Sequence, residues 1–284
     1  MTVRCVVAAV DGSPQSLAAV TWAADEAWRR QVPLRLVHAC LWERYERETP
    51  DEDEPLSVRG EARQLTAAAL TTAAARRPSV EITTEIVPED AVTALLGLGG
   101  LAPLLVLGHR GRRGLAGPRL GPVALRVVAR ADYPVVVVRR APSAPSAPTG
   151  RVVLAVDEDG EGTAAAAGFA VAAARLRSAE LEVVHAFRRD SLRPAPAVPT
   201  TGVAREEQAE RLVADVALPG SHGLTVHRHA RPGRTAEVLL DAAAGADLVV
   251  LAARRHGHRG LRHGSVARAV LHRARCPVLV VPVG

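Results

Sequence analysis

A glycine-rich, basic loop between two apolar segments is the part of this sequence whose residue types could do chemistry. Residues 104–107 are uncharged leucines and valine, a run short enough for a buried parallel strand. Five glycines follow it at close intervals: Gly108, Gly111, Gly114, Gly117 and Gly121. Helix-like spacing resumes at Val123, and a strand, a glycine loop and a helix start together present backbone N–H groups to an anion, usually a phosphate. The same pattern also serves as a plain βα connection, so both interpretations stay open here.

The elements that must position this loop alternate between strand-like and helix-like patterns. In the first half, we expect strands at 6–10, 34–39, 80–87, 104–107 and 135–139, and helices at 14–30, 60–76, 90–98 and 123–130. Ser13 and Pro14 are typical of an N-cap and a first helical residue, and the acidic run 43–55 indicates a solvated loop. This alternation predicts a doubly wound, Rossmann-like parallel sheet with its ligand crevice at the carboxyl ends of the strands.

The second half of the chain repeats the first. Four segments return in the same order: 6–11 at 153–157, 36–39 at 183–186, 104–107 at 248–251, and 134–138 at 277–281. Matching order with a small drift in spacing indicates a tandem duplication, that is, two α/β domains, each with a five-stranded parallel sheet. The run of Ala, Pro and Ser at 141–150 is typical of an exposed linker. We therefore expect one domain at 1–140 and another at 151–284.

The composition argues against several classes of protein. Hydrophobic residues make up 48% of the chain but aromatic residues only 2%, so Val, Leu and Ala must fill the core. The formal net charge is +6, yet the arginines are mixed with acids and few aromatic rings could stack on bases, which argues against nucleic-acid binding. Three cysteines without CxxC spacing, and a start that does not resemble a signal peptide, predict a protein of the reducing cytoplasm.

One uncharged segment reaches the lower length limit of a membrane span. Residues 91–108 contain no charged side chain over 18 residues. Pro103 and the glycines before it favour a helix, a turn and a strand instead. The corresponding segment of the repeat, 236–251, carries Glu237, Asp241 and Asp247, and both copies should share one environment. We therefore expect no membrane span.

Most catalytic and metal chemistry lacks the residues that it needs. The chain contains no lysine, which excludes a Walker-type phosphate loop and Schiff-base catalysis. Asp157 begins a run that hints at a calcium loop, but Gly168 stands where its last glutamate belongs. Three histidines, His256, His258 and His263, lie among arginines that would repel a metal ion. Because no general acid–base pair can be identified, we expect no enzyme, and a weak ATPase ranks last among the alternatives.

The joint order of these motifs resembles the tandem form of the universal stress protein family. The resemblance rests on VVAAVDGS at 6–13, Val-His-Ala at 37–39, GHRG at 108–111 with nine residues before Gly121, and a closing strand after Pro134. It covers nearly the whole chain in two copies. It implies a stress-associated regulatory protein that binds ATP, with or without Mg²⁺. It also implies that the two domains pair through their last strands, 135–138 and 278–281, and it leaves a homodimer open.

The resemblance further implies which residues contact the nucleotide. Asp11 would face the adenosine, the backbone around Val37 would meet the adenine edge, and Leu107 would lie against the base, while glycines wrap the ribose and phosphates. The candidate set in the first copy is Ala9, Asp11, Val37, Leu107, Gly108, Gly111, Gly121, Pro122 and Val123, and in the second copy Asp157, Gly264 and Ser265. Bland alternatives stand beside these roles. Asp11 could only cap the next helix, and duplication alone explains why His38 returns as His185.

Both copies depart from the ATP-binding pattern of the family, G-x-x-G, nine residues, then G-[ST]. Pro122 replaces the hydroxyl residue in the first copy, which removes one or two hydrogen bonds to phosphate. The second copy keeps Gly264 and Ser265 but has Ala252, Arg254 and Arg255 at the first glycine turn. We therefore expect the nucleotide in the first domain and a degenerate second domain. The alternative is a protein-interaction module in which both sites have decayed.

Overall fold

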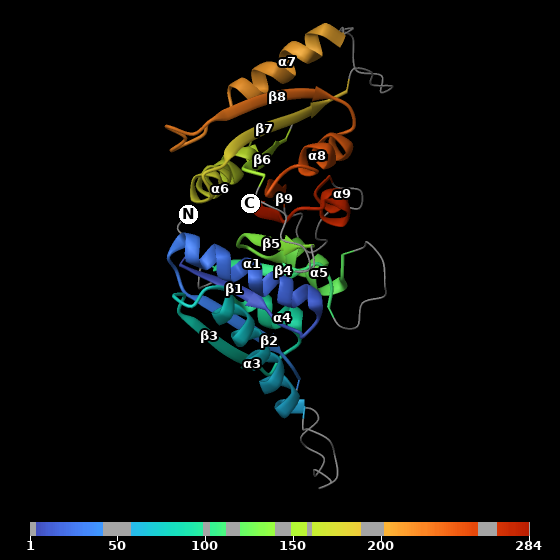
Figure 1. The fold of residues 1–284 in the computed structure, drawn as a ribbon. Coiled ribbons are helices and arrows are strands. Elements are labelled where there is room, and N and C mark those ends of the chain that lie inside the picture. The colour runs from blue at the N-terminus through green and yellow to red at the C-terminus, as the bar shows by residue number, and fades with distance from the viewer. Residues whose placement is uncertain are drawn as a thin grey trace. The chain divides into compact units, whose positions relative to one another are not determined.

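Strands and helices alternate along the chain in the computed structural model, which describes residues 4–41, 58–98, 103–111, 120–139, 149–157, 161–188, 202–254 and 266–283. The contacts within the chain divide it into two units, residues 1–145 (unit 1) and 146–284 (unit 2). In Figure 1, unit 1 runs from blue to green and unit 2 from yellow-green to red.

Unit 1 consists of a parallel sheet with helices on both faces. Its elements are β1 (Cys5–Ala9), α1 (Pro14–Arg30), β2 (Leu34–Ala39), α3 (Val58–Arg76), β3 (Ile82–Val87), α4 (Ala91–Leu96), β4 (Pro103–Gly108), α5 (Pro122–Arg130) and β5 (Val135–Val138). The strands pair in the order β3-β2-β1-β4-β5. Helices α1 and α3 contact each other, as do α4 and α5 (Figure 1). The strand order reverses between β1 and β4, the place where doubly wound sheets bind ligands.

Unit 2 repeats this architecture. Its elements are β6 (Arg151–Val156), α6 (Glu161–Arg177), β7 (Glu180–Phe187), α7 (Gly202–Ala214), β8 (Val226–Pro232), α8 (Thr235–Ala243), β9 (Leu248–Arg254), α9 (Val266–Arg273) and β10 (Val278–Val283). The parallel strands of this unit pair in the order β10-β9-β6-β7-β8. The order matches that of unit 1 when β6 is placed on β1.

Side-chain caps define the ends of α1. Ser13 is its N-cap, with a hydroxyl that accepts a hydrogen bond from the Ser16 N–H at 3.1 Å, and Pro14 is its first residue. The helix ends at Gln31, whose left-handed backbone (φ 54°) stops the helical path. These ends are those that the sequence predicts.

An ion-pair cluster fixes α3 on α1. The Asp25 carboxylate of α1 is buried and accepts hydrogen bonds from Arg76 at 2.7 Å and Arg77 at 2.6 Å. The Arg77 guanidinium also lies 4.1 Å from the centre of the Trp28 ring. A carboxylate held by two guanidinium groups sets the position of the whole helix, and α3 forms part of the wall of the site described below.

The core of both units is built from valine, leucine and alanine, as the composition predicts. In β5 all the side chains, and in β6 all but the first, are buried, and small alanines on α1 and α6 allow these helices to lie close to the sheet. Among the described residues, the buried aromatic side chains are Tyr133, Phe169 and Phe187. The doubly wound tandem fold is thus confirmed.

The element bounds expected in the first half of the chain differ from the structure by at most two residues at either end. The uncharged segment contains α4 and β4, so the expected helix and strand within it are confirmed. Among the described residues, no helix is both long and apolar enough to span a membrane. The acidic run 43–55 and most of the linker lie outside the described residues. At the end of the linker, Asp247 accepts hydrogen bonds from the backbone N–H groups of Thr149 and Gly150, both at 2.8 Å.

Candidate functional site

A cavity of about 990 Å³ opens at the carboxyl ends of β1 and β4, where the strand order reverses. Its volume lies at the upper end of the range that small-molecule sites occupy. All nine candidate residues of the first copy line it: Ala9, Asp11, Val37, Leu107, Gly108, Gly111, Gly121, Pro122 and Val123. Residues that are far apart in the sequence therefore meet at one place because parallel strands end at the same edge of the sheet.

Asp11 organises the turn between β1 and α1. Its carboxylate accepts hydrogen bonds from the Ser13 hydroxyl at 2.6 Å and from the Ser13 N–H at 3.0 Å. Its own N–H donates to the Ser16 hydroxyl at 3.4 Å. Ser13, not Asp11, caps α1, so Asp11 holds the capping residue in place while it also lines the cavity.

Two glycines of the loop pack closely against neighbouring atoms, Gly108 against backbone and Gly111 against a side chain. A β-carbon on Gly108 would lie 2.7 Å from the backbone carbonyl of Gln15, so the start of α1 sits directly against the end of β4. A β-carbon on Gly111 would lie 2.3 Å from the Asp11 carboxylate. These contacts explain both glycines without a ligand, and they also hold the glycine turn at the cavity.

Gly121 and Pro122 form the start of α5. The Gly121 N–H donates to the carbonyl of His109 at 2.7 Å, and Gly121 makes no side-chain cap. The sequence predicts a helix from Val123, but Pro122 is its first residue, where a missing N–H costs a helix nothing. The missing N–H of residue 122 matters for a ligand instead, because an N–H at this position would point out of the start of α5 and could donate to a bound anion.

The sequence-based search missed a wall of the cavity that comes from α3, from the end of β3 and from α4. This wall contains Glu61, Leu65, Glu89, Asp90 and Leu95. Asp90 caps α4 by accepting hydrogen bonds from the N–H groups of Val92 and Thr93, and hydrogen bonds from Thr93 lower its pKa. One signal was available: Glu89 and Asp90 follow directly on a predicted strand, so they had to reach the same edge of the sheet as Asp11.

His38 and His185 have the same structural role in the two units. The Nδ1 atom of His38 lies 2.6 Å from the carbonyl oxygen of Val10, and that of His185 lies 3.1 Å from the carbonyl oxygen of Val156. Because a carbonyl only accepts, Nδ1 must carry the hydrogen in both rings. Each histidine ties its strand to the residue before Asp11 or Asp157 of its own unit, so a ligand is not needed to explain the repeat.

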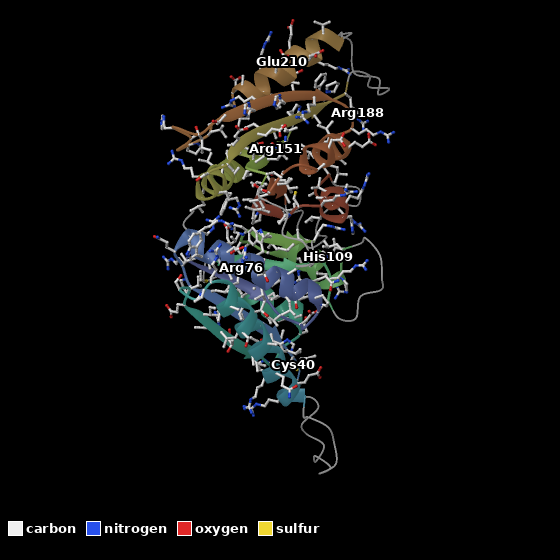
Figure 2. The ribbon with its side chains drawn as sticks, in the orientation of Figure 1. Cys40, Arg76, His109, Arg151, Arg188 and Glu210 are labelled. Carbon is white, nitrogen blue, oxygen red and sulfur yellow. The ribbon has the colours of Figure 1, made fainter. Side chains whose placement is uncertain are left out.

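Positive charge gathers around the turn after β4. Arg110 lines the cavity, and His109, labelled in Figure 2, precedes it. Burial lowers the pKa of His109, and the charges of Arg139 and Arg110 lower it further. The pKa of Arg139 is likewise lowered by burial and by Arg110. The positive charge of Arg110 disfavours the charged forms of both neighbours, and an anion would stabilise this arrangement.

The corresponding place in unit 2 is built differently. The Asp157 carboxylate accepts from the Thr163 hydroxyl at 2.9 Å, and Ala252 occupies the register position of Gly108. A β-carbon on Gly162 would lie 2.9 Å from that of Ala252. Gly264 and Ser265, the other candidates in this unit, lie outside the described residues.

The comparisons with known proteins agree with the fold. The model of the universal stress protein family matches residues 2–139 and 148–282. A universal stress protein of Mycobacterium tuberculosis is 33% identical over 287 residues, covering 97% of this chain and 96% of its own, and a second one is 30% identical over 303 residues, covering 98% and 95%.

Solved structures show the same architecture. A universal stress protein from Archaeoglobus fulgidus has a TM-score of 0.68 at 16% identity, with both chains covered completely. A functionally unknown protein from Pseudomonas aeruginosa has a TM-score of 0.63 at 17% identity, covering 99% of this chain and 92% of its own. With two tandem matches to the family model and full-length relatives at this identity, the chain belongs to the universal stress protein family.

Proposed function

We propose that unit 1 binds an adenine nucleotide, ATP with or without Mg²⁺, and that this binding has a regulatory output in stress. The observation that carries the proposal is the convergence of nine candidate residues from four chain segments on one cavity. A regulatory protein needs only binding. Unit 2, with Ala252 at the first glycine position, is not part of the proposed site.

The two ends of the cavity differ in the way a nucleotide requires. Val37, Leu95 and Leu107, which are almost completely buried, form the apolar floor of one end, against which a base can lie. The opposite end is formed by Gly108, Gly111 and the start of α5, where backbone groups are accessible and the helix end is positive.

Isothermal titration of the full chain with ATP, ADP and AMP, each with and without Mg²⁺, tests the proposal. We expect saturable binding near one nucleotide per chain. A Gly121→Asp variant should abolish it, because the new carboxylate stands at the helix start and repels phosphate.

Gly97→Asp is the matched control. It adds the same charge to the same unit at an exposed position, outside the cavity lining, where a β-carbon has nothing within 4 Å. It should bind like the parent chain. A folded parent that gives no heat up to millimolar nucleotide would contradict the proposal and favour a protein-interaction module.

A further inference from the structure

We propose that Arg110 is the residue that recognises the phosphate chain in this site, and that the site therefore prefers nucleoside di- and triphosphates over the monophosphate and the nucleoside. The inference rests on the proposed nucleotide site of unit 1. It assigns to the Arg110 side chain the phosphate binding to which a hydroxyl at position 122, absent here because of Pro122, would contribute.

The start of α5 offers few donors of its own. The first N–H groups of a helix have no partner within the helix, and here they belong to positions 121–124. Gly121 uses its N–H on the carbonyl of His109, and Pro122 has none. Val123 and Ala124 remain, and both line the cavity. Two backbone donors are a small set for a group that carries several negative charges, so a cationic side chain has to add to them.

Arg110 stands beside that helix start on a fixed backbone. Its carbonyl oxygen lies 3.4 Å from the hydroxyl oxygen of Ser13, the cap of α1, which donates its hydrogen to Asp11 at 2.6 Å. Its Cα lies 3.3 Å, and its Cγ 3.9 Å, from the place that a β-carbon on Gly121 would take. The side chain therefore leaves from a set point at the start of α5, and a preorganised donor loses little freedom when a ligand binds.

The charges around the cavity give the ligand one orientation. Arg110 is the one arginine among the described residues that line it, whereas Glu61, Glu89 and Asp90, on the wall described above, are acids. The fourth acid of the lining, Asp11, lies beside the glycine turn and accepts hydrogen bonds from Ser13. Phosphate oxygens are attracted to the guanidinium, which can donate two parallel hydrogen bonds to them, and are repelled by the carboxylates. The phosphate chain then lies toward Arg110 and the ribose and base toward the acidic wall.

The basic groups next to Arg110 support the same assignment. His109 and Arg139 both have lowered pKa values, through burial first and through neighbouring positive charge second. The Nδ1 atom of His109 is also buried and has no hydrogen-bond partner among the described residues. A bound phosphate chain would offset this concentration of like charge, and the gain grows with the number of negative charges that it brings.

Titration of three full-length proteins with ATP, ADP, AMP and adenosine tests the inference. They are the parent, Arg110→Gln, and the control Arg130→Gln, which removes the same charge from the exposed end of α5 outside the cavity lining. Arg110→Gln should weaken ATP about 10- to 100-fold, AMP less, and adenosine less than twofold. Arg130→Gln should match the parent. The ATP affinity of the parent should also fall with added salt more steeply than that of Arg110→Gln.

Each other outcome decides against a stated claim. Unchanged ATP affinity in Arg110→Gln, or an equal loss for ATP and adenosine, overturns the role of Arg110 but leaves the nucleotide site standing. No binding of any of the four ligands to the folded parent overturns the proposed site, and this inference with it. Equal affinity of the parent for ATP and adenosine likewise refutes the phosphate preference while Gly121→Asp still tests the site.

Discussion

The two units solve the same packing problem with glycines on opposite sides of one contact. In unit 1 the glycine is on the strand, because Gly108 faces the backbone of Gln15 at the start of α1. In unit 2 the strand has Ala252, and the glycine is on the helix, at Gly162. Gln15 and Gly162 occupy corresponding helix positions, because the residue after each of them supplies a hydroxyl that accepts a hydrogen bond from an aspartate N–H. These residues are Ser16, which accepts from Asp11, and Thr163, which accepts from Asp157. A close helix–strand contact is therefore what both units keep, and only unit 1 keeps a strand end without a side chain.

This difference bears on function because the strand end is also the edge of the candidate site. In unit 1 the contact leaves Gly108 with no side chain at the cavity. In unit 2 a methyl group stands at the matching position, so a phosphate could not approach the backbone as closely. Four experiments, given in order of decreasing effect, test this difference between the two units.

The glycine exchange predicts a strong coupling between two positions of unit 2. Gly162→Ala should reduce the local free energy of unfolding by about 2 kcal/mol, because its β-carbon would lie 2.8 Å from the Asp157 carboxylate and 2.9 Å from the β-carbon of Ala252. Adding Ala252→Gly should recover at least half of that loss. Hydrogen exchange of peptides from α6 measures this change in local stability. Tryptophan fluorescence would not report on unit 2, because the three tryptophans of the chain are all in the first half.

Gly168→Ala is the control for this cycle. It lies in the same helix, but a β-carbon there has nothing within 4 Å, so the helix should gain up to about 1 kcal/mol. Strictly additive effects of Gly162→Ala and Ala252→Gly would show that the two positions are not in the proposed contact.

Reversed ion pairs between the second and third strands give the next test. Unit 1 pairs Arg35 of β2 with Glu85 of β3, both partly exposed, whereas unit 2 pairs a buried Glu182 of β7 with Arg231 of β8. Arg231→Ala should cost about 2 kcal/mol because it leaves a buried carboxylate with Arg151 alone at 3.4 Å. Arg35→Ala should cost less than about 1 kcal/mol. Urea titration of each variant checks this order, and equal losses would contradict it.

A reciprocal exchange at the helix starts sharpens the functional difference. Pro122→Ser restores an N–H and a hydroxyl at the start of α5, so it should raise ATP affinity about tenfold. Ser265→Pro makes the opposite change in unit 2 and should leave both the affinity and the stoichiometry of ATP unchanged. Loss of bound nucleotide in Ser265→Pro would instead place a second site in unit 2.

Thiol reactivity gives the smallest and most local test. Burial raises the pKa of Cys276 to about 12, so at pH 8 its thiolate population falls roughly a thousandfold below that of an ordinary cysteine. Cys40, labelled in Figure 2, lines the cavity of unit 1, and iodoacetamide should modify it first. Saturating ATP should slow modification of Cys40 but not of Cys5, which lies outside the lining. An unchanged rate at Cys40 would argue against a nucleotide in this cavity.

The sequence predicts most of the fold because each element carries its own periodicity and its own start signal. Ser13 and Pro14 begin α1 as expected, and the repeat of the pattern predicts the second unit. It predicts the first-copy candidates that follow β1 and β4 because strand ends must meet at one edge. The pairing of the two units through β5 and β10 remains a prediction.

The rest depends on tertiary contacts that no local pattern encodes. Glu61 reaches the cavity because Asp25 holds α3 in place, a contact between residues about fifty positions apart. Gly162 looks like an ordinary helix glycine until Ala252 is seen opposite it. The sequence pattern predicts that Gly108 binds phosphate, yet the close contact with the backbone of α1 requires a glycine there even without a ligand.

The different placement of the glycine, on the strand at Gly108 and on the helix at Gly162, also has a consequence for recombination between the two halves of the gene. Recombination between the two copies would bring together strand and helix segments that were not selected as partners. One hybrid would place Ala252 against the start of α1, where a β-carbon at the position of Gly108 would lie 2.7 Å from the backbone of Gln15. The reciprocal hybrid would place Gly108 against Gly162 and leave a gap between strand and helix. Either hybrid would fold less well than its parents. Selection against such hybrids would suppress gene conversion across this contact and leave the two halves free to diverge.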